Sequence, residues 1–251
     1  PFELIPIIEE ILVIDPAQYN YWFNLGVENI KIRKYSIAID AFKKGLTLYP
    51  ASENPSLVQI YVSLSFCYNK IYKHQKEKEI LDHASQFYPD HPGIIGRYAI
   101  CAHSRLRFKE ADFHLQRLTL ALRAEGLNES DLAFYIGKLY LNTDYLVAEK
   151  YFRVAYQYDP QNIEKQGALA WVLIKNALKI NEGMSLIAKA IEADPDNAIL
   201  IHQQGYGFFV KGKYEDALFN LYSARDLYQE YNYDLFDHIR QVEEALARIE
   251  D

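Results

Sequence analysis

The sequence predicts an all-α protein built from stacked pairs of antiparallel helices. Five similar segments end in proline, at Pro16, Pro50, Pro89, Pro160 and Pro195. The intervals between these prolines are 34, 39, 71 and 35 residues, and the third interval is close to twice the last. A period near 34 residues is typical of repeats in which each unit is one helical hairpin. An array of such units has a long surface and no single deep core, so the sequence favours binding over catalysis.

The composition indicates a folded chain. Half of the 251 residues are hydrophobic and 24% are charged, which excludes an intrinsically disordered protein. The formal charge of −7 argues against unaided binding to nucleic acid or to an anionic membrane. The longest apolar run, Ala168 to Ile174, is too short to span a bilayer. Cys67 and Cys101 are the only cysteines, and we expect both to be buried, reduced thiols.

The N-terminus carries no targeting signal that the sequence reveals. It begins Pro1-Phe-Glu-Leu-Ile-Pro, has no basic region and is interrupted by Glu9 and Glu10, which excludes a signal peptide. Since there is no initiator methionine, we expect the chain to begin inside a longer natural protein. We expect a cytoplasmic location.

Residues 19–52 serve as the template of the repeat. One face of its first helix carries positions 4, 7 and 8, which are Trp22, Leu25 and Gly26. One face of its second helix carries positions 20 and 24, which are Ala38 and Phe42. The small residues at positions 8 and 20 allow the two backbones to approach closely, while large residues fill the space beside them. Pro50 at position 32 cannot continue the second helix and ends it.

Five further segments follow this pattern with local departures: 58–91, 92–125, 130–162, 163–197 and 198–231. Glu77 stands where alanine is expected, and Arg123 and Gln229 replace the closing proline. Short insertions at 53–57 and 126–129 separate neighbouring units and account for the longer proline intervals. Because Arg123 is followed at once by an insertion, we expect the array to bend or hinge there, between a front part through the third repeat and a back part from Ser130.

This pattern resembles the tetratricopeptide repeat, whose signature is Trp-x2-Leu-Gly-x2-Tyr, then Ala-x3-Phe, then Pro. The resemblance covers nearly the whole chain. It implies a right-handed α-α superhelix of the tetratricopeptide-repeat type, forming a single array over residues 1–251. At its ends, residues 1–18 hold the helix of a truncated preceding repeat, and residues 232–251 form a capping helix. The apolar face of that cap carries Leu235, Ile239, Val242, Leu246 and Ile249.

The resemblance also implies a concave groove, lined by the first helix of each pair, that binds a peptide or protein segment. The residues expected to contact a partner there are Phe23, Asn24, Phe66, Lys70, Arg97, Phe134, Tyr135, Lys138, Trp171, Lys175, His202 and Tyr206. Five groove positions are Lys or Arg and two are acidic, so the groove has a local charge of about +3. Aromatic anchors beside cations are typical of binding surfaces. We therefore expect a partner segment with acidic and apolar character.

Two alternatives limit this interpretation. A register error of one residue would place half of the groove aromatics in the core between helices. Some members of the family bind chaperone C-termini through a carboxylate clamp, and Asn24 and Arg97 occupy positions that match it, whereas Val27, Ser63 and Gly93 do not. We do not expect that clamp. A variant carboxylate site near Asn24, Lys70 and Arg97 stays open.

No motif indicates catalysis, and we predict no catalytic residue, metal or cofactor. The sequence has no His-Glu-x2-His, no Cys-x2-Cys, no glycine-rich phosphate loop and no Gly-x-Ser-x-Gly. Asn128, in a glycosylation-like triplet, is interpreted as a helix N-cap. The predicted function is a non-enzymatic scaffold or adaptor. The alternatives are a peptide-sensing regulatory domain with an attached output domain and the substrate-recruiting arm of a larger enzyme. The sequence does not indicate an oligomeric state.

Overall fold

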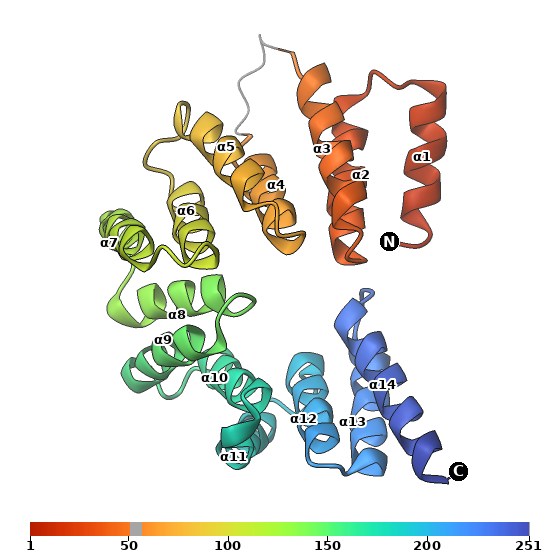
Figure 1. Cartoon of the computed structure of the whole chain (residues 1–251). Helices are drawn as coiled ribbons and strands as arrows, with labels where there is room; N and C mark the ends of the chain where they lie inside the picture. The colour runs from red at the N-terminus through yellow and green to blue at the C-terminus, as the bar shows by residue number, and fades with distance from the viewer. Residues whose placement is uncertain (51–56, 251) are drawn as a thin grey trace. The chain divides into compact units, whose positions relative to one another are not determined.

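The computed structural model describes residues 1–50 and 57–250, and its regular elements there are helices (Figure 1). The predicted all-α fold class is confirmed. In chain order the helices are α1 (Leu4–Ile14), α2 (Tyr19–Lys31), α3 (Tyr35–Leu48), α4 (Val58–Lys70), α5 (His74–Ser85), α6 (Pro92–Ser104), α7 (Phe108–Ala124), α8 (Glu129–Tyr140), α9 (Tyr145–Tyr158), α10 (Ile163–Lys175), a 3-10 turn η1 (Ala177–Lys179), α11 (Ile180–Ala193), α12 (Ala198–Val210), α13 (Tyr214–Leu227) and α14 (Tyr233–Glu250).

The helices form two compact units, each described here by itself. The first unit is Pro1–Glu125 and the second is Gly126–Asp251. The boundary lies at the start of the insertion expected at 126–129. The single array over the whole chain and the hinge near Arg123 stay predictions. Most of the other expected insertion, 53–57, lies outside the described residues.

Helices pair closely because a ring of the second helix occupies the space above a glycine of the first. In the α2–α3 pair, a Cβ atom added to Gly26 would lie 2.5 Å from the ring of Phe42. In the α8–α9 pair, a Cβ atom on Gly137 would lie 2.5 Å from the ring of Phe152. Both rings are fully buried. The role predicted for the small residue at position 8 is confirmed in these pairs, since any side chain there would force the helices apart.

Four of the turns inside the pairs share a left-handed residue. Arg33, Tyr72 and Leu106 each have φ 58°, and Gly212 has φ 72°. After each of them a backbone N–H donates to a carbonyl five residues earlier, as from Lys34 to Asn29 at 2.9 Å. This bond satisfies a carbonyl that the end of the first helix leaves unpaired. Only one of the four positions is glycine, so the sequence did not reveal the turn.

The closing prolines stand where the second helices end. Pro16, Pro50, Pro160 and Pro195 each follow the last residue of a helix by two positions. Where Arg123 replaces proline, α7 continues to Ala124 and reaches 17 residues. The chain then turns at a glycine with φ 90°, and the side chain of Asn128 accepts the N–H of Asp131 at 2.9 Å. The N-cap interpretation of Asn128 is therefore confirmed.

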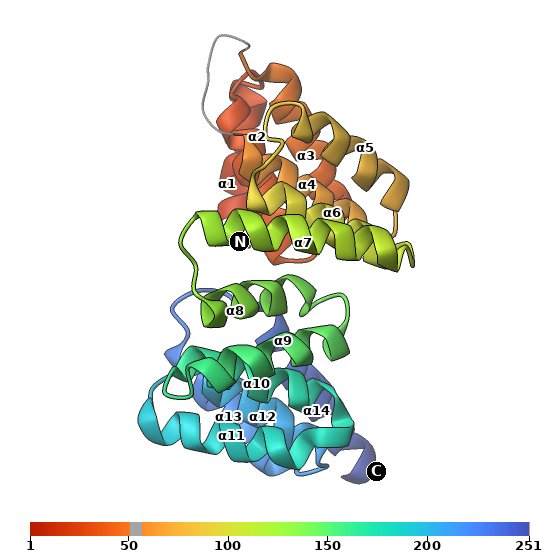
Figure 2. The ribbon, with the colours of Figure 1, turned by 90° about the vertical axis from the view of Figure 1, so that its left-hand side faces the viewer.

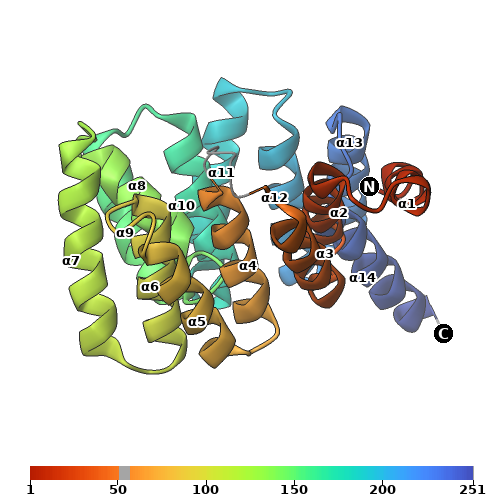
Figure 3. The same cartoon turned by 90° about the horizontal axis from the view of Figure 1, so that it is seen from above.

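Within each unit, the first helices of successive pairs are neighbours. In the first unit α2 contacts α4 and α4 contacts α6, and Figure 3 shows the helices of this unit in order from α1 to α7. In the second unit α10 contacts α12 and α12 contacts α14, and Figure 2 shows the layers from α8 to α11. One side of each unit is thus formed by first helices. The last helix, α14, buries Leu235, Ile239 and Val242 against α13.

The two cysteines lie in the core of the first unit. Both thiols are free and almost completely buried, as predicted. Burial raises the pKa of each to about 12, because the thiolate loses its hydration. Neither thiol is therefore activated as a nucleophile.

Candidate functional site

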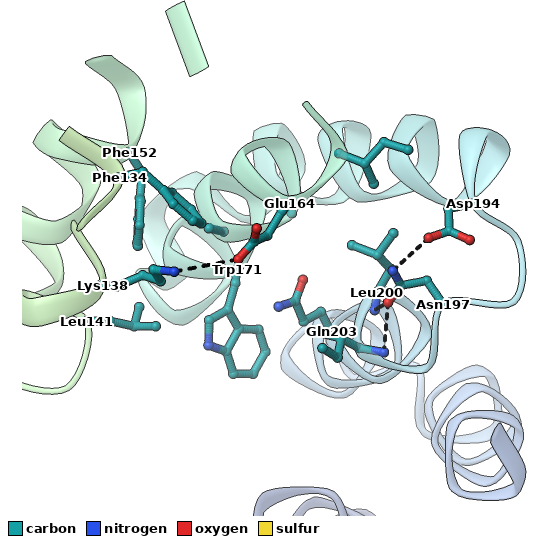
Figure 4. Close-up of a pocket in the computed structure, with 14 residues that line it drawn as sticks. Phe134, Lys138, Leu141, Phe152, Glu164, Trp171, Asp194, Asn197, Leu200 and Gln203 are labelled. Atoms are coloured by element: carbon teal, nitrogen blue, oxygen red, sulfur yellow. Dashed lines mark hydrogen bonds and ion pairs between the residues drawn. The ribbon is translucent and has the colours of Figure 1, made fainter. Parts of the chain in front are cut away.

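The second unit contains a pocket of about 360 Å³ on the side formed by its first helices (Figure 4). Most of its lining is apolar, with a few polar groups among the rings and methyl groups. The lining residues come from α8, α9, α10, α12 and the loops between them: Phe134, Lys138, Leu141, Phe152, Ile163, Glu164, Gly167, Ala168, Trp171, Asp194, Asn197, Ile199, Leu200 and Gln203. A pocket of this size and polarity is within the range of ligand sites, roughly 300–1,000 Å³.

Two small residues of α10 create the hollow. Gly167 and Ala168 both line the pocket, together with residues of α8 and α12. A Cβ atom on Gly167 would lie 2.7 Å from a methyl carbon of Leu200. The glycine therefore allows α12 to approach α10, and Ala168 leaves the adjoining volume open.

A lysine lies at one wall of the pocket, above an aromatic ring. The Nζ atom of Lys138 is 4.3 Å from the ring centroid of Phe134 and 3.7 Å from a carboxylate oxygen of Glu164. Phe134 itself is buried and packs against Phe152 at 5.7 Å between centroids. An exposed cation above a ring gains about 0.5–1 kcal/mol. This contact holds the ammonium group at the pocket's edge, where it remains about half exposed.

Trp171 continues the surface toward the end of the unit. Tyr206 packs against it at 5.3 Å between centroids, and the Nζ atom of Lys175 lies 4.6 Å from the Trp171 centroid and 3.8 Å from that of Tyr206. In the first unit, Lys70 lies 5.4 Å above Phe66 in the same manner. An aromatic residue four positions before a lysine thus recurs on α4, α8 and α10. This spacing of four residues between a ring and a lysine is visible in the sequence and could have identified the three aromatic–lysine pairs.

The predicted groove residues divide between the two units. Phe134, Lys138 and Trp171 line the pocket, and Tyr206 and Lys175 adjoin Trp171. Tyr135 is half-buried on α8 outside the pocket lining. In the first unit Phe66 and Lys70 form one aromatic–lysine pair, and Asn24 is exposed on α2.

Phe23 belongs to the core of the first unit. Its side chain is 9% exposed and packs in a cluster with Ala38 and Phe42. The expectation that it contacts a partner is corrected, because its ring fills the space beside Gly45 on α3. The predicted register itself holds, because Gly26 packs on Phe42 as expected; Phe23 is buried although its position was assigned to the groove.

Arg97 is buried as well, and its charge is matched inside the chain. Its guanidinium donates to the carboxylate of Glu77 at 2.6 Å and to the hydroxyl of Ser65 at 2.9 Å. Asn69 donates to the other oxygen of Glu77 at 2.9 Å. Burial lowers the pKa of Arg97, while the charge of Glu77 opposes that shift. The carboxylate that Arg97 binds is the chain's own, so the variant carboxylate site with Asn24 and Lys70 is not retained.

His202 is buried in a chain of polar groups between α10, α12 and α14. Its Nε2 atom is 2.8 Å from Nδ1 of His238, whose Nε2 atom is 3.4 Å from Nζ of Lys175. The hydroxyl of Tyr228 lies 3.5 Å from Nδ1 of His202. Burial, together with the charge of Lys175, lowers the pKa of His202 to about 4. His202 is thus neutral near pH 7 and joins helices rather than facing a partner, which corrects its predicted role.

The local charge of the first-helix side is smaller than the sequence suggested. Besides the Arg97–Glu77 pair, Lys31 lies 2.8 Å from Glu28, and Lys138 faces Glu164. Glu28 and Glu77 are outside the expected groove positions: Glu28 lies one turn from Lys31 on α2, and Glu77 reaches Arg97 from α5. The count of about +3 omitted them.

No group of three or more His, Cys, Asp and Glu side chains in the described residues is arranged to hold a metal ion. None of the helices described above combines the length and the hydropathy of a membrane span. The absence of catalysis stays a prediction.

No family model matches the chain, and no curated protein matches it. Solved structures do. A tetratricopeptide repeat protein from Parabacteroides merdae superposes with a TM-score of 0.52 at 16% identity, over 91% of this chain and 87% of that one. The chain has the tetratricopeptide-repeat fold.

Two larger proteins show the same tetratricopeptide-repeat fold over part of their length. A chain of the APC/C hetero-tetramer Cut9–Hcn1 aligns at 13% identity with a TM-score of 0.50, over 96% of this chain and 46% of that one. Yeast Tom70 aligns at 15% identity with a TM-score of 0.50, over 99% of this chain and 59% of that one. This chain therefore spans about half the length of these two proteins.

Replacing Glu77 by the alanine of the repeat signature should destabilise the first unit. Glu77→Ala leaves the buried guanidinium of Arg97 without its carboxylate, which we expect to cost about 3–5 kcal/mol of unfolding free energy. Urea denaturation followed by circular dichroism measures this. The control is Lys78→Ala, which removes the exposed pair with Asp82 on the same helix and should cost less than about 1 kcal/mol. Equal stability of Glu77→Ala and the unchanged chain would contradict this account.

Acid should destabilise the second unit through His202. An imidazole in the unfolded chain titrates near its ordinary pKa of about 6.5, whereas that of His202 is lowered to about 4. The unfolded state therefore binds the proton first, and the stability present above about pH 6.5 falls by about 1.4 kcal/mol per pH unit as the pH drops toward 4. The free energy of unfolding, obtained from urea titrations between pH 7.5 and 4.5, should show this slope. His202→Gln should flatten it, and His91→Asn, at an exposed site in the first unit, should not.

Proposed function

We propose that this chain is a protein-interaction module whose second unit binds a segment of a partner protein. The partner places one large apolar side chain in the pocket between α8, α10 and α12. The observation that carries this proposal is the pocket itself, which is apolar, is lined by aromatic rings and opens on the side formed by first helices. Rings and deep apolar pockets are the features that anchor partner side chains in protein interfaces.

The pocket is an anchor point rather than a complete site. Burying one large apolar side chain contributes about 1.5–3 kcal/mol, which alone corresponds to weak binding. Additional contacts are available from Trp171, Lys175 and Tyr206, which adjoin the pocket on α10 and α12. A segment crossing this surface would bury the pocket and the aromatic pair together.

The lysine at the pocket wall favours a partner with an acidic residue near its apolar anchor. Lys138 stays about half exposed, and Glu164 beside it is more exposed still, so their mutual attraction is weak. A partner carboxylate could approach Lys138 without loss of a buried contact. For the second unit we keep the proposal, made from the sequence, that the partner segment is acidic and apolar. Arg97 has no part in this proposal.

Filling the pocket should weaken binding. Peptides selected from a displayed library against the unchanged chain supply the ligand, and isothermal titration measures their affinity. Ala168→Leu places a larger side chain in the hollow and should weaken binding at least about tenfold. Ala188→Leu makes the same change at an exposed site on α11 and should leave affinity within about twofold. Equal affinity for the two variants would contradict the proposed site.

Reversing the charge at the pocket's edge should weaken the same peptides. Lys138→Glu replaces an attraction by a repulsion, which we expect to lower affinity about threefold to tenfold, with the difference fading at high salt. Lys189→Glu, an exposed lysine on α11, is the matched control for net charge. If both variants lower affinity equally, only the overall charge of the chain matters, and the partner does not contact Lys138.

A further inference from the structure

One end of the first unit is strongly basic. The segments that join the helices of its three pairs, with the adjoining helix ends, are 31–36, 70–76 and 104–109. They contain no Asp or Glu and nine of the chain's 27 Lys and Arg residues. Widening each segment by four residues at both ends gives ten Lys and Arg against six Asp and Glu, whereas the whole chain has 27 against 34. Two of the loops between successive pairs, 15–18 and 86–91, contain two aspartates and no Lys or Arg.

The three basic turns lie at the same end of the unit. Asn69 at the end of α4 donates to the hydroxyl of Ser104 at the end of α6 at 3.0 Å. Tyr35 at the start of α3 packs on Phe66 of α4 at 5.9 Å between ring centroids. Figure 3 shows the turns α2–α3, α4–α5 and α6–α7 on one side of this unit. Their charges therefore form one continuous basic end.

Large apolar side chains stand exposed among these cations. Tyr72 is 85% exposed, Leu106 is 74% exposed and Phe108 is 54% exposed. Tyr72 and Leu106 also have φ 58°, a left-handed conformation that is unfavourable for large side chains. The α12–α13 turn has Gly212 at the equivalent place. Neither packing nor backbone preference accounts for Tyr72 and Leu106, which indicates a contact outside the chain.

The helix ends do not account for the cations either. Lys34, Lys73 and Arg107 are the N-cap residues of α3, α5 and α7, and none of their side chains forms a capping hydrogen bond. A helix N-terminus favours acidic and small polar side chains and disfavours positive charge. The N-cap of α9 follows that rule, since Asp144 accepts two backbone N–H groups. Cations at these three N-caps oppose the helix dipoles, so an anionic ligand explains them better than folding does.

We propose that this basic end of the first unit binds the surface of an anionic lipid membrane. Lysine and arginine side chains contact the lipid headgroups, and Tyr72 and Leu106 enter the interface beneath them. A nucleic acid or an acidic peptide would match the cations but leave the side chain of Leu106 in water. The negative charge of the whole chain does not oppose this binding, because salt screens exposed charges that lie more than about 8 Å away. The proposal concerns the first unit and does not depend on the pocket of the second.

Sedimentation of the full chain with lipid vesicles tests this proposal. The partition coefficient should be at least about tenfold higher for phosphatidylcholine vesicles with about 30% phosphatidylserine than for pure phosphatidylcholine vesicles. The difference should shrink as salt is raised. Equal partitioning into the two kinds of vesicle would overturn the proposal.

Charge reversal locates the membrane contact. Lys34→Glu combined with Lys73→Glu should lower the partition coefficient at least about twentyfold, since each cation near an anionic surface contributes about fivefold. Lys43→Glu combined with Lys44→Glu changes two exposed lysines of α3 outside the turns and should lower it less than about threefold. An equal loss in both double variants assigns binding to net charge alone and overturns the basic end as the site.

The apolar tips distinguish a membrane from a soluble anion. Tyr72→Asn combined with Leu106→Asn keeps residues that tolerate φ 58° and should lower partitioning at least about tenfold. Phe87→Asn, at a 62% exposed ring in the loop 86–91, should leave it unchanged within about twofold. The proposal fails if the Asn double variant binds vesicles as well as the unchanged chain. It also fails if polyglutamate or a single-stranded RNA displaces the chain from vesicles and binds the Asn double variant equally well. Circular dichroism checks folding, and the vesicle preference of the unchanged chain needs no variant.

Discussion

The close approach of two helices, with a ring of one packed over a glycine of the other, is the contact on which the rest of this structure depends. Phe42 over Gly26 and Phe152 over Gly137 bring the two helices of their pairs together. A helix pair cannot bury its apolar faces alone, so each pair must pack on its neighbours. The result is a unit in which first helices lie beside one another and form one continuous side.

The pocket is a variation on the same packing. Where α10 carries Gly167 and Ala168, the side formed by first helices is hollow instead of filled, and the rings of Phe134 and Trp171 border the hollow. The glycine contact that closes a helix pair elsewhere acts here between neighbouring pairs, because a methyl group of Leu200 occupies the space beside Gly167. One packing rule thus accounts for both the stack and its pocket.

Buried polar groups fix which helices meet. Glu77 departs from the alanine of the repeat signature, and its carboxylate joins α4, α5 and α6 through Ser65 and Arg97. In the second unit, His202 and His238 join α12 to the final helix. The side chains of Glu77, Arg97, His202 and His238 are matched inside the chain, so these four join helices and do not face a partner.

The fold class followed from the sequence because proline spacing and the small residue at position 8 are local signals. Side-chain placement did not follow as well. Arg97 was expected at the surface because its partner, Glu77, stands twenty residues earlier on another helix. The repeat pattern assigns each position to a face of its own helix and does not show which residues of two helices meet. Phe23 illustrates the limit of helical periodicity, since the space that its ring fills is left by Gly45 on the next helix, which the pattern of α2 alone does not reveal. The pocket depends on two small residues in α10 and on the rings around them, which only the packed structure combines.

A crystal structure of the chain with a selected peptide bound tests the central claim most directly. The account predicts one large side chain of the peptide in the space bordered by Phe134, Trp171 and Leu200, with α8, α10 and α12 packed as they are without it. A peptide bound on the second helices α9, α11 and α13, with the pocket left unfilled, would contradict it.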